Sequence, residues 1–101
     1  MSVIKVTKEN YQEVVLNEKK KVLLDFWAPG CGPCRMVSPI VDEIAEERGD
    51  IVVGKVNVDE EIELASQFRV MSIPTLVVLQ NGEVANRVVG ARPKADILKL
   101  L

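Results

Sequence analysis

The segment VLLDFWAPGCGPC, residues 22–34, places two cysteines directly after the most apolar stretch of the chain. Its first seven residues form a nearly unbroken apolar run, which is typical of a central β-strand covered on both faces. The Pro-Gly pair at residues 29–30 ends this strand. A helix is expected from residue 31 or 32 to about residue 48, with Met36 in its apolar stripe and a kink at Pro39. The two cysteines therefore lie where a helix begins at the end of a buried strand.

Strand and helix patterns alternate on both sides of this segment. Apolar and β-branched runs predict strands at residues 3–6, 51–58, 75–80 and 83–89, the last two joined by an Asn-Gly turn. Helical patterns predict helices at residues 7–17, 60–68 and 94–101, the first with Thr7 as its N-cap. The order β-α-β-α-β-α-β-β-α predicts the α/β class, with one mixed sheet of about five strands flanked by about four helices.

The composition describes a globular protein with an ordinary balance of residues. The chain has 101 residues, of which 48% are hydrophobic and 28% are charged, and its net charge is -2. This length fits one domain over residues 1–101, with a monomer as the default. Nothing in the charge balance indicates a nucleic-acid partner, and no run approaches the ~20 apolar residues that span a membrane. Because the N-terminus lacks the apolar run of a signal peptide, a cytoplasmic protein is expected.

Cys31 and Cys34 are the two cysteines of the chain, and their spacing suits redox chemistry. The two intervening residues let the sulfurs close a small ring with little backbone movement. The N–H groups and the dipole at a helix N-terminus favour the thiolate form of the first cysteine. Pro33 suits the first helical turn, because its missing N–H is not needed there. We expect Cys31 to attack a disulfide, and Cys34 to resolve the mixed disulfide that forms.

Three other interpretations of the cysteine pair involve no redox activity. A zinc site needs four ligands, and the chain offers two thiolates and no histidine, so no metal is expected. A structural disulfide in so short a loop would contribute only roughly 2 kcal/mol, and a cytosol would keep it reduced. Two buried, unreactive thiols are the third interpretation. The residues alone favour redox chemistry and leave the other interpretations open.

Asp25 is a carboxylate inside the most apolar predicted strand. Burial raises the pKa of a carboxyl group, because desolvation disfavours the charged form. A carboxylate of this kind near Cys34 is suited to accept the proton of the resolving thiol. The alternative is that Asp25 lies near the strand end and is merely solvated.

The segment from Asp25 to Arg35 resembles the active-site segment of the thioredoxin family. Further matches cover essentially the whole chain at the expected spacings: Pro39, Asn57, Asp59, Ile73-Pro74-Thr75, Asn81-Gly82 and Val89-Gly90-Ala91. Gly30 and Arg35 depart from the family, which usually has Trp and Lys at these positions. The resemblance implies the thioredoxin fold and a general protein disulfide reductase that acts on protein disulfides. It also implies that a thioredoxin reductase recycles the protein, and that its own dithiol serves in place of a dissociable cofactor.

The resemblance also implies roles for individual residues. A cis Pro74 would pack against the active-site disulfide, and would leave the Ile73 backbone free to pair with an extended substrate. Asp25 would act in proton transfer with Lys55 as its neighbour, whereas the strand pattern alone makes Lys55 an outward-facing polar residue. The implied active-site loop comprises Trp27, Gly30, Gly32 and Pro33. The implied substrate-binding residues are Val58, Ile73, Val89, Gly90 and Ala91, of which Val58 and Val89 are equally good core candidates.

Two rival functions remain for the same fold. A thiol oxidase or isomerase would use the same cysteines, but the Gly32-Pro33 pair resembles the reducing branch of the family. A binding module would use the fold without redox chemistry, and Gly30, which alters the contact surface, is the feature that favours it. No Gly-rich dinucleotide fingerprint is present, so the electron donor is expected to be a separate protein.

Overall fold

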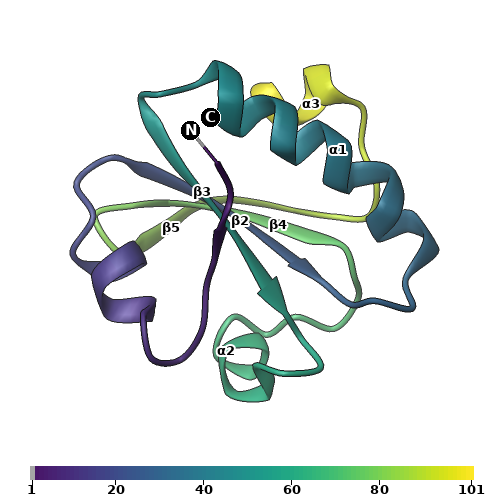
Figure 1. Ribbon diagram of the computed structural model, residues 1–101, viewed down its shortest axis with the longest axis horizontal. Coiled ribbons are helices and arrows are strands. Elements are labelled where there is room, and N and C mark those ends of the chain that lie inside the picture. The colour runs from purple at the N-terminus through teal and green to yellow at the C-terminus, as the bar shows by residue number, and fades with distance from the viewer. Residues whose placement is uncertain (1) are drawn as a thin grey trace.

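The computed structural model describes residues 2–101 and shows a mixed five-stranded sheet with helices on both faces (Figure 1). The sheet order is β1-β3-β2-β4-β5. Its strands are β1 (Ile4–Lys5), β2 (Lys21–Trp27), β3 (Ile51–Asn57), β4 (Thr75–Gln80) and β5 (Glu83–Val89). The helical segments are the π-helical η1 (Gln12–Leu16), α1 (Gly32–Glu47), α2 (Ile62–Gln67) and α3 (Lys94–Leu98). The predicted α/β class and the predicted order of elements are confirmed.

Strand β2 lies at the centre of the sheet, which accounts for its apolar run. It is parallel to β3, with Asp25 opposite Lys55, and antiparallel to β4. Strand β5 forms the antiparallel edge, and joins β4 through a turn in which Asn81 and Gly82 both have positive φ, 54° and 78°. This left-handed backbone is the conformation that an Asn-Gly turn adopts readily.

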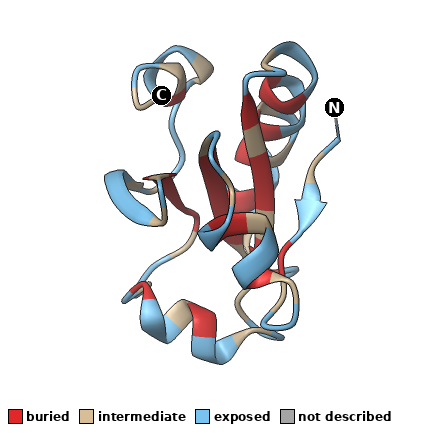
Figure 2. Ribbon diagram, turned by 90° about the vertical axis from the view of Figure 1, so that its left-hand side faces the viewer, coloured by how far each residue is buried: buried red, intermediate tan, exposed pale blue. Residues whose placement is uncertain are grey.

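Alternate residues of β2 face two separate apolar cores. Leu24 and Phe26 face η1 and α2, whereas Leu23 faces α1 and α3. Figure 1 shows α1 and α3 together on one side of the sheet and α2 on the other, and Figure 2 shows buried residues concentrated in the central strands. Because side chains alternate along a strand, Asp25 points to the same side as Leu23, toward α1.

Two predictions about helices are wrong. The helix expected from Thr7 begins only at Gln12, although residues 7–10 form a turn whose reciprocal hydrogen bonds have the capping-box pattern. In this turn the Thr7 N–H donates to Asn10 Oδ1 at 2.7 Å, and the Asn10 N–H donates to Thr7 Oγ1 at 3.3 Å. Met36 is 70% exposed and lies outside the buried stripe of α1, because the stripe instead passes through the adjacent Val37.

Candidate active site

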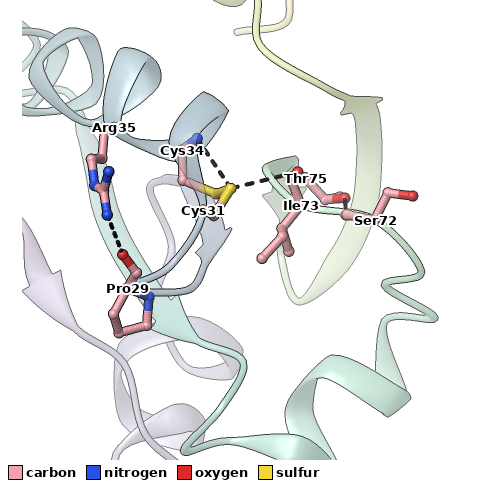
Figure 3. The surroundings of a disulfide bond; sticks show 7 residues. All are labelled: Pro29, Cys31, Cys34, Arg35, Ser72, Ile73 and Thr75. Carbon is pink, nitrogen blue, oxygen red and sulfur yellow. Dashed lines mark hydrogen bonds between the residues drawn. A yellow bond between two sulfur atoms is a disulfide. The ribbon is translucent and has the colours of Figure 1, made fainter.

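Cys31 and Cys34 form a disulfide at the point where β2 leads into α1 (Figure 3). Their Cα atoms lie 5.3 Å apart. Cys31 is the N-cap of α1, and its Sγ accepts a hydrogen bond from the Cys34 N–H at 3.2 Å. Pro33 lies in the first turn of the helix, as predicted. An N–H group directed at Cys31 Sγ from a 16-residue helix favours negative charge on this sulfur.

The two sulfurs differ in accessibility. Cys31 is half-buried, whereas the whole Cys34 residue is only 3% exposed. Gly32 and Pro33 between them are exposed, so the loop that joins the cysteines projects from the surface. A substrate disulfide can therefore reach Cys31, whereas the surrounding protein shields Cys34.

The loop before β4 lies directly beside the disulfide. The Ile73–Pro74 peptide bond is cis, in the geometry that the resemblance implied. Cys31 Sγ lies 3.8 Å from the Ile73 carbonyl oxygen, and Thr75 Oγ1 donates a hydrogen bond to the Ser72 carbonyl at 2.6 Å (Figure 3). Pro74 is buried, and its carbonyl accepts a hydrogen bond from the Gly90 N–H at 2.8 Å. The structure thus places the Ile73 carbonyl beside Cys31 and Gly90 beside Pro74.

A cavity of about 170 Å³ lies behind the disulfide. The residues that line it are Asp25, Trp27, Ala28, Pro29, Cys34, Arg35, Ser38 and Lys55. Asp25 is 1% exposed, and neither of its carboxylate oxygens accepts a hydrogen bond from any protein group within residues 2–101. Burial raises the pKa of Asp25 to about 6, the Lys55 ammonium acts against this rise, and the Asp42 carboxylate adds to it. The interpretation of Asp25 as a solvated residue at a strand end is therefore wrong.

Lys55 lies on the α1 side of the sheet, facing the cavity, and does not point away from the protein as the strand pattern alone suggested. Its side chain is 20% exposed, and its Nζ lies 3.4 Å from Asp42 Oδ1 and donates a hydrogen bond to Ser38 Oγ. Sequence reasoning missed Ser38 and Asp42. Their four-residue spacing on one helix places both on the same face, but nothing local indicates that this face meets Lys55.

Of the remaining predicted site residues, some lie near the cavity or near Pro74, and one packs into a core. Trp27 lines the cavity, and Val89, Gly90 and Ala91 follow one another near Pro74, with Val89 44% exposed. Val58 instead packs against the core that faces η1 and α2, and its N–H donates to the Trp27 carbonyl at 2.9 Å. The structure thus gives Val58 a packing role.

Gly30, the main departure from the family pattern, is exposed just before Cys31. Apart from its chain neighbours, no atom of the described residues would lie within 4 Å of a Cβ atom added at this position. The surface beside Cys31 is therefore open on this side. The guanidinium of Arg35 donates to the Pro29 carbonyl at 3.0 Å and braces the loop that contains Gly30.

Within residues 2–101, no three His, Cys, Asp or Glu side chains gather in a way that could hold a metal ion. Over the same residues, no helix combines the length and the apolar character needed to cross a membrane.

Comparisons with known proteins match the whole of this architecture. The family model described as Thioredoxin matches residues 2–101. The chain is 50% identical over 97 residues to Thioredoxin 1 of Nostoc sp., an alignment that covers 95% of this chain and 91% of the relative. It is 48% identical over 99 residues to thioredoxin of Mycobacterium tuberculosis, covering 97% and 85%. It is also 46% identical over 97 residues to the bifunctional thioredoxin reductase/thioredoxin of Mycobacterium leprae, covering 95% of this chain and 21% of that protein.

Proposed function

The chain belongs to the thioredoxin family and is a thiol–disulfide oxidoreductase, and we propose that Cys31 is its nucleophile and Cys34 its resolving thiol. The observation that carries this assignment is the difference in exposure between the half-buried Cys31 and the buried Cys34. The hydrogen bond from the Cys34 N–H to Cys31 Sγ supports it further, because it stabilises a thiolate on Cys31.

The proposed cycle transfers two electrons to a substrate disulfide. The Cys31 thiolate attacks one sulfur of that disulfide, forms a mixed disulfide and expels the other sulfur as a thiolate. Cys34 then loses its proton and attacks Cys31 Sγ, which releases the second substrate sulfur. The substrate is left as a dithiol, and Cys31 and Cys34 are left as the disulfide seen in the structure.

Asp25 is the proposed acceptor of the Cys34 proton. It lines the same cavity as Cys34, and its pKa of about 6 places it near neutral pH, where a general base works best. Lys55 lines that cavity too, so its ammonium is suited to set how strongly Asp25 holds the proton.

The backbone of Ile73 is the proposed docking point for the substrate. Among the described residues, no backbone N–H donates to the Ile73 carbonyl, although this oxygen lies 3.8 Å from Cys31 Sγ. An extended substrate segment can therefore pair with Ile73 as an added strand while its disulfide meets Cys31. The exposed Val89, which lies opposite Thr75, and the exposed Ala91 are proposed to contact the same segment.

We further propose that a thioredoxin reductase restores the dithiol. The name of the Mycobacterium leprae relative, which joins thioredoxin reductase and thioredoxin in one protein, supports this pairing. A reductant of this kind needs a reducing compartment, so the cytoplasm is the proposed location. Both cysteines and the Ile73 backbone lie in one chain, and we propose that the chain acts as a monomeric single domain over residues 1–101.

The reduction potential of the Cys31–Cys34 pair is the first test of this function. The oxidised protein is equilibrated in graded thiol/disulfide buffers, and free thiols are trapped and counted. We expect a reversible two-electron couple more reducing than the glutathione poise of about −220 to −260 mV. A clearly more oxidising couple would instead assign the protein to the oxidases or isomerases of this fold.

Serine variants test the two cysteine roles separately. Cys31→Ser is expected to abolish reduction of insulin disulfides and to form no mixed disulfide. Cys34→Ser is expected to attack insulin once and to remain attached to it, because no thiol resolves the adduct. If Cys34→Ser forms no adduct and Cys31→Ser does, the assigned roles are reversed.

A further inference from the structure

The buried carboxylate of Asp25 and the nearby ammonium of Lys55 do not pair with each other. The two residues are directly opposite in the parallel strands β2 and β3, and both line the cavity behind Cys34. Yet no described residue donates a hydrogen bond to either Asp25 oxygen, and the carboxylate in ion-pair contact with Lys55 is Asp42. An ammonium beside a buried, unpartnered carboxylate is expected to turn toward it unless other groups hold it.

Helix α1 supplies the groups that hold Lys55. Ser38 and Asp42 lie one helical turn apart on the face of α1 toward β3. Ser38 Oγ accepts a hydrogen bond from Lys55 Nζ, and Asp42 Oδ1 lies 3.4 Å from the same nitrogen. The two contacts differ in surroundings, because the Asp42 side chain is 57% exposed whereas Ser38 is half-buried and lines the cavity. The contact with Asp42 is screened by solvent and is therefore weak, whereas the hydrogen bond to Ser38 lies at the cavity and is screened less.

We propose that Ser38 is a positioning residue for the resolving step: its hydroxyl holds the Lys55 ammonium on the α1 side of the cavity and so keeps the Asp25 carboxylate unpaired. This inference rests on the proposed role of Asp25 as proton acceptor. An unpaired buried carboxylate is a stronger base than one neutralised by an adjacent ammonium. Ser38 therefore acts on Cys34 through two other residues and touches no substrate.

The other groups that face Asp25 do not replace this arrangement. Strand β4 places the uncharged Leu76 opposite Asp25. From α1 the cavity receives Cys34 and Arg35 besides Ser38, and the Arg35 guanidinium is engaged by the Pro29 carbonyl. Asp42, also on α1, acts on Asp25 in the opposite sense to Lys55, since its negative charge raises the pKa of Asp25. Lys55 is thus the cation whose position Ser38 controls.

The experiment follows the Asp25 carboxyl carbon by NMR through a pH titration of the oxidised protein. Ser38→Ala removes the hydroxyl and keeps a strong helix former, so the fold is retained. With Lys55 free to approach, the lowering that it already exerts becomes stronger, and the pKa of Asp25 is expected to fall by up to about one pH unit. In the reduced variant, the acid limb of the pH profile for release of a substrate mixed disulfide is expected to move to lower pH by a similar amount.

Three further variants make the result specific. Ser38→Thr keeps the hydroxyl and should retain the wild-type titration. Ser66→Ala, the same change at an exposed position of α2, should leave the titration unchanged. In a Lys55→Met background, Ser38→Ala should have no effect on the pKa of Asp25, because the ammonium is gone.

An unchanged or raised pKa of Asp25 in Ser38→Ala would overturn the proposal, as would an equal fall in the Lys55→Met background. The titration uses the oxidised protein and needs no turnover. A failure here is therefore distinct from a failure of the proposed reductase function, which the potential and the serine variants of the cysteines report.

Discussion

Asp25 is a buried ionisable residue whose charged form lowers the stability of the folded protein. Its pKa rises from the ordinary value of 3.8 to about 6 because burial disfavours the charged form. The folded protein therefore binds this proton more tightly than the unfolded chain does. The free energy of unfolding consequently falls as the pH rises from about 4 to above 6, and the full penalty at higher pH is about 3 kcal/mol.

Asp25→Asn removes the buried charge, so it is expected to stabilise the oxidised protein at pH 8. We expect a gain of about 2 to 3 kcal/mol, reduced somewhat because the new amide also lacks partners. The gain should become small at pH 3.5, where most of the wild-type Asp25 is protonated in both the folded and the unfolded state. Urea unfolding at pH 3.5 and pH 8 measures both values, with Asp59→Asn as the exposed control. A pH-independent difference would show that packing, not charge, separates the two proteins.

Among the elements, the junction of β1 with β3 depends on a residue without a side chain. Gly54 lies opposite Ile4 in β1 and Leu24 in β2. A Cβ atom at this position would lie 2.6 Å from Val6 Cγ2 and 3.1 Å from Leu24 Cδ2, with the Ile4 carbonyl at 3.5 Å. The two-residue strand β1 has little pairing with which to resist displacement.

Gly54→Ala is therefore expected to destabilise the protein by about 1 to 3 kcal/mol, the usual cost of overpacking. Urea unfolding measures the loss. Gly49→Ala is the matched control, since a Cβ atom there meets nothing within 4 Å. Equal stability of the two variants would mean that β1 and Val6 move aside without cost.

Elements are predictable from sequence where a local signal and the packing agree. The strands β4 and β5 occupy residues 75–80 and 83–89 as predicted, because alternation and the Asn-Gly turn act together. The helix start expected at Thr7 was too early, because the regular helical segment begins only at Gln12, although the Thr7 hydroxyl accepts the capping-type hydrogen bond from the Asn10 N–H. The prediction that Met36 belongs to the buried stripe of α1 was wrong, although the adjacent Val37 does belong to it. Successive residues of a helix point about 100° apart, so neighbours can differ in burial.

The site residues likewise differ in whether a local sequence signal predicts them. The cysteine pair and the burial of Asp25 are encoded in one contiguous segment and were predictable from it. The contact between Ser38 and Lys55 joins residues 17 apart, on a helix and a strand, and depends on how α1 is set over β3. No short-range pattern carries that information.

At the scale of the whole molecule, the disulfide couples redox state to folding. Cys31 and Cys34 close a loop of four residues, which removes roughly 2 kcal/mol of chain entropy from the unfolded state. The oxidised protein is therefore expected to be more stable than the reduced protein by roughly this amount. Urea unfolding with and without a phosphine reductant measures the difference, and the Cys31→Ser/Cys34→Ser double variant should not respond to the reductant.

The same difference must appear in the reduction potentials, because folding and oxidation form a closed thermodynamic cycle. If the oxidised form is favoured by roughly 2 kcal/mol, the Cys31–Cys34 couple should be about 40 mV more negative in the folded protein than in urea. Equal stabilities, or a more stable reduced form, would mean that the disulfide is unfavourable in the folded state. This effect would cancel at least the roughly 2 kcal/mol that comes from restricting the unfolded chain. The folded couple would then be no more reducing than that of the unfolded chain, and the assignment as a reductant would lose its thermodynamic support.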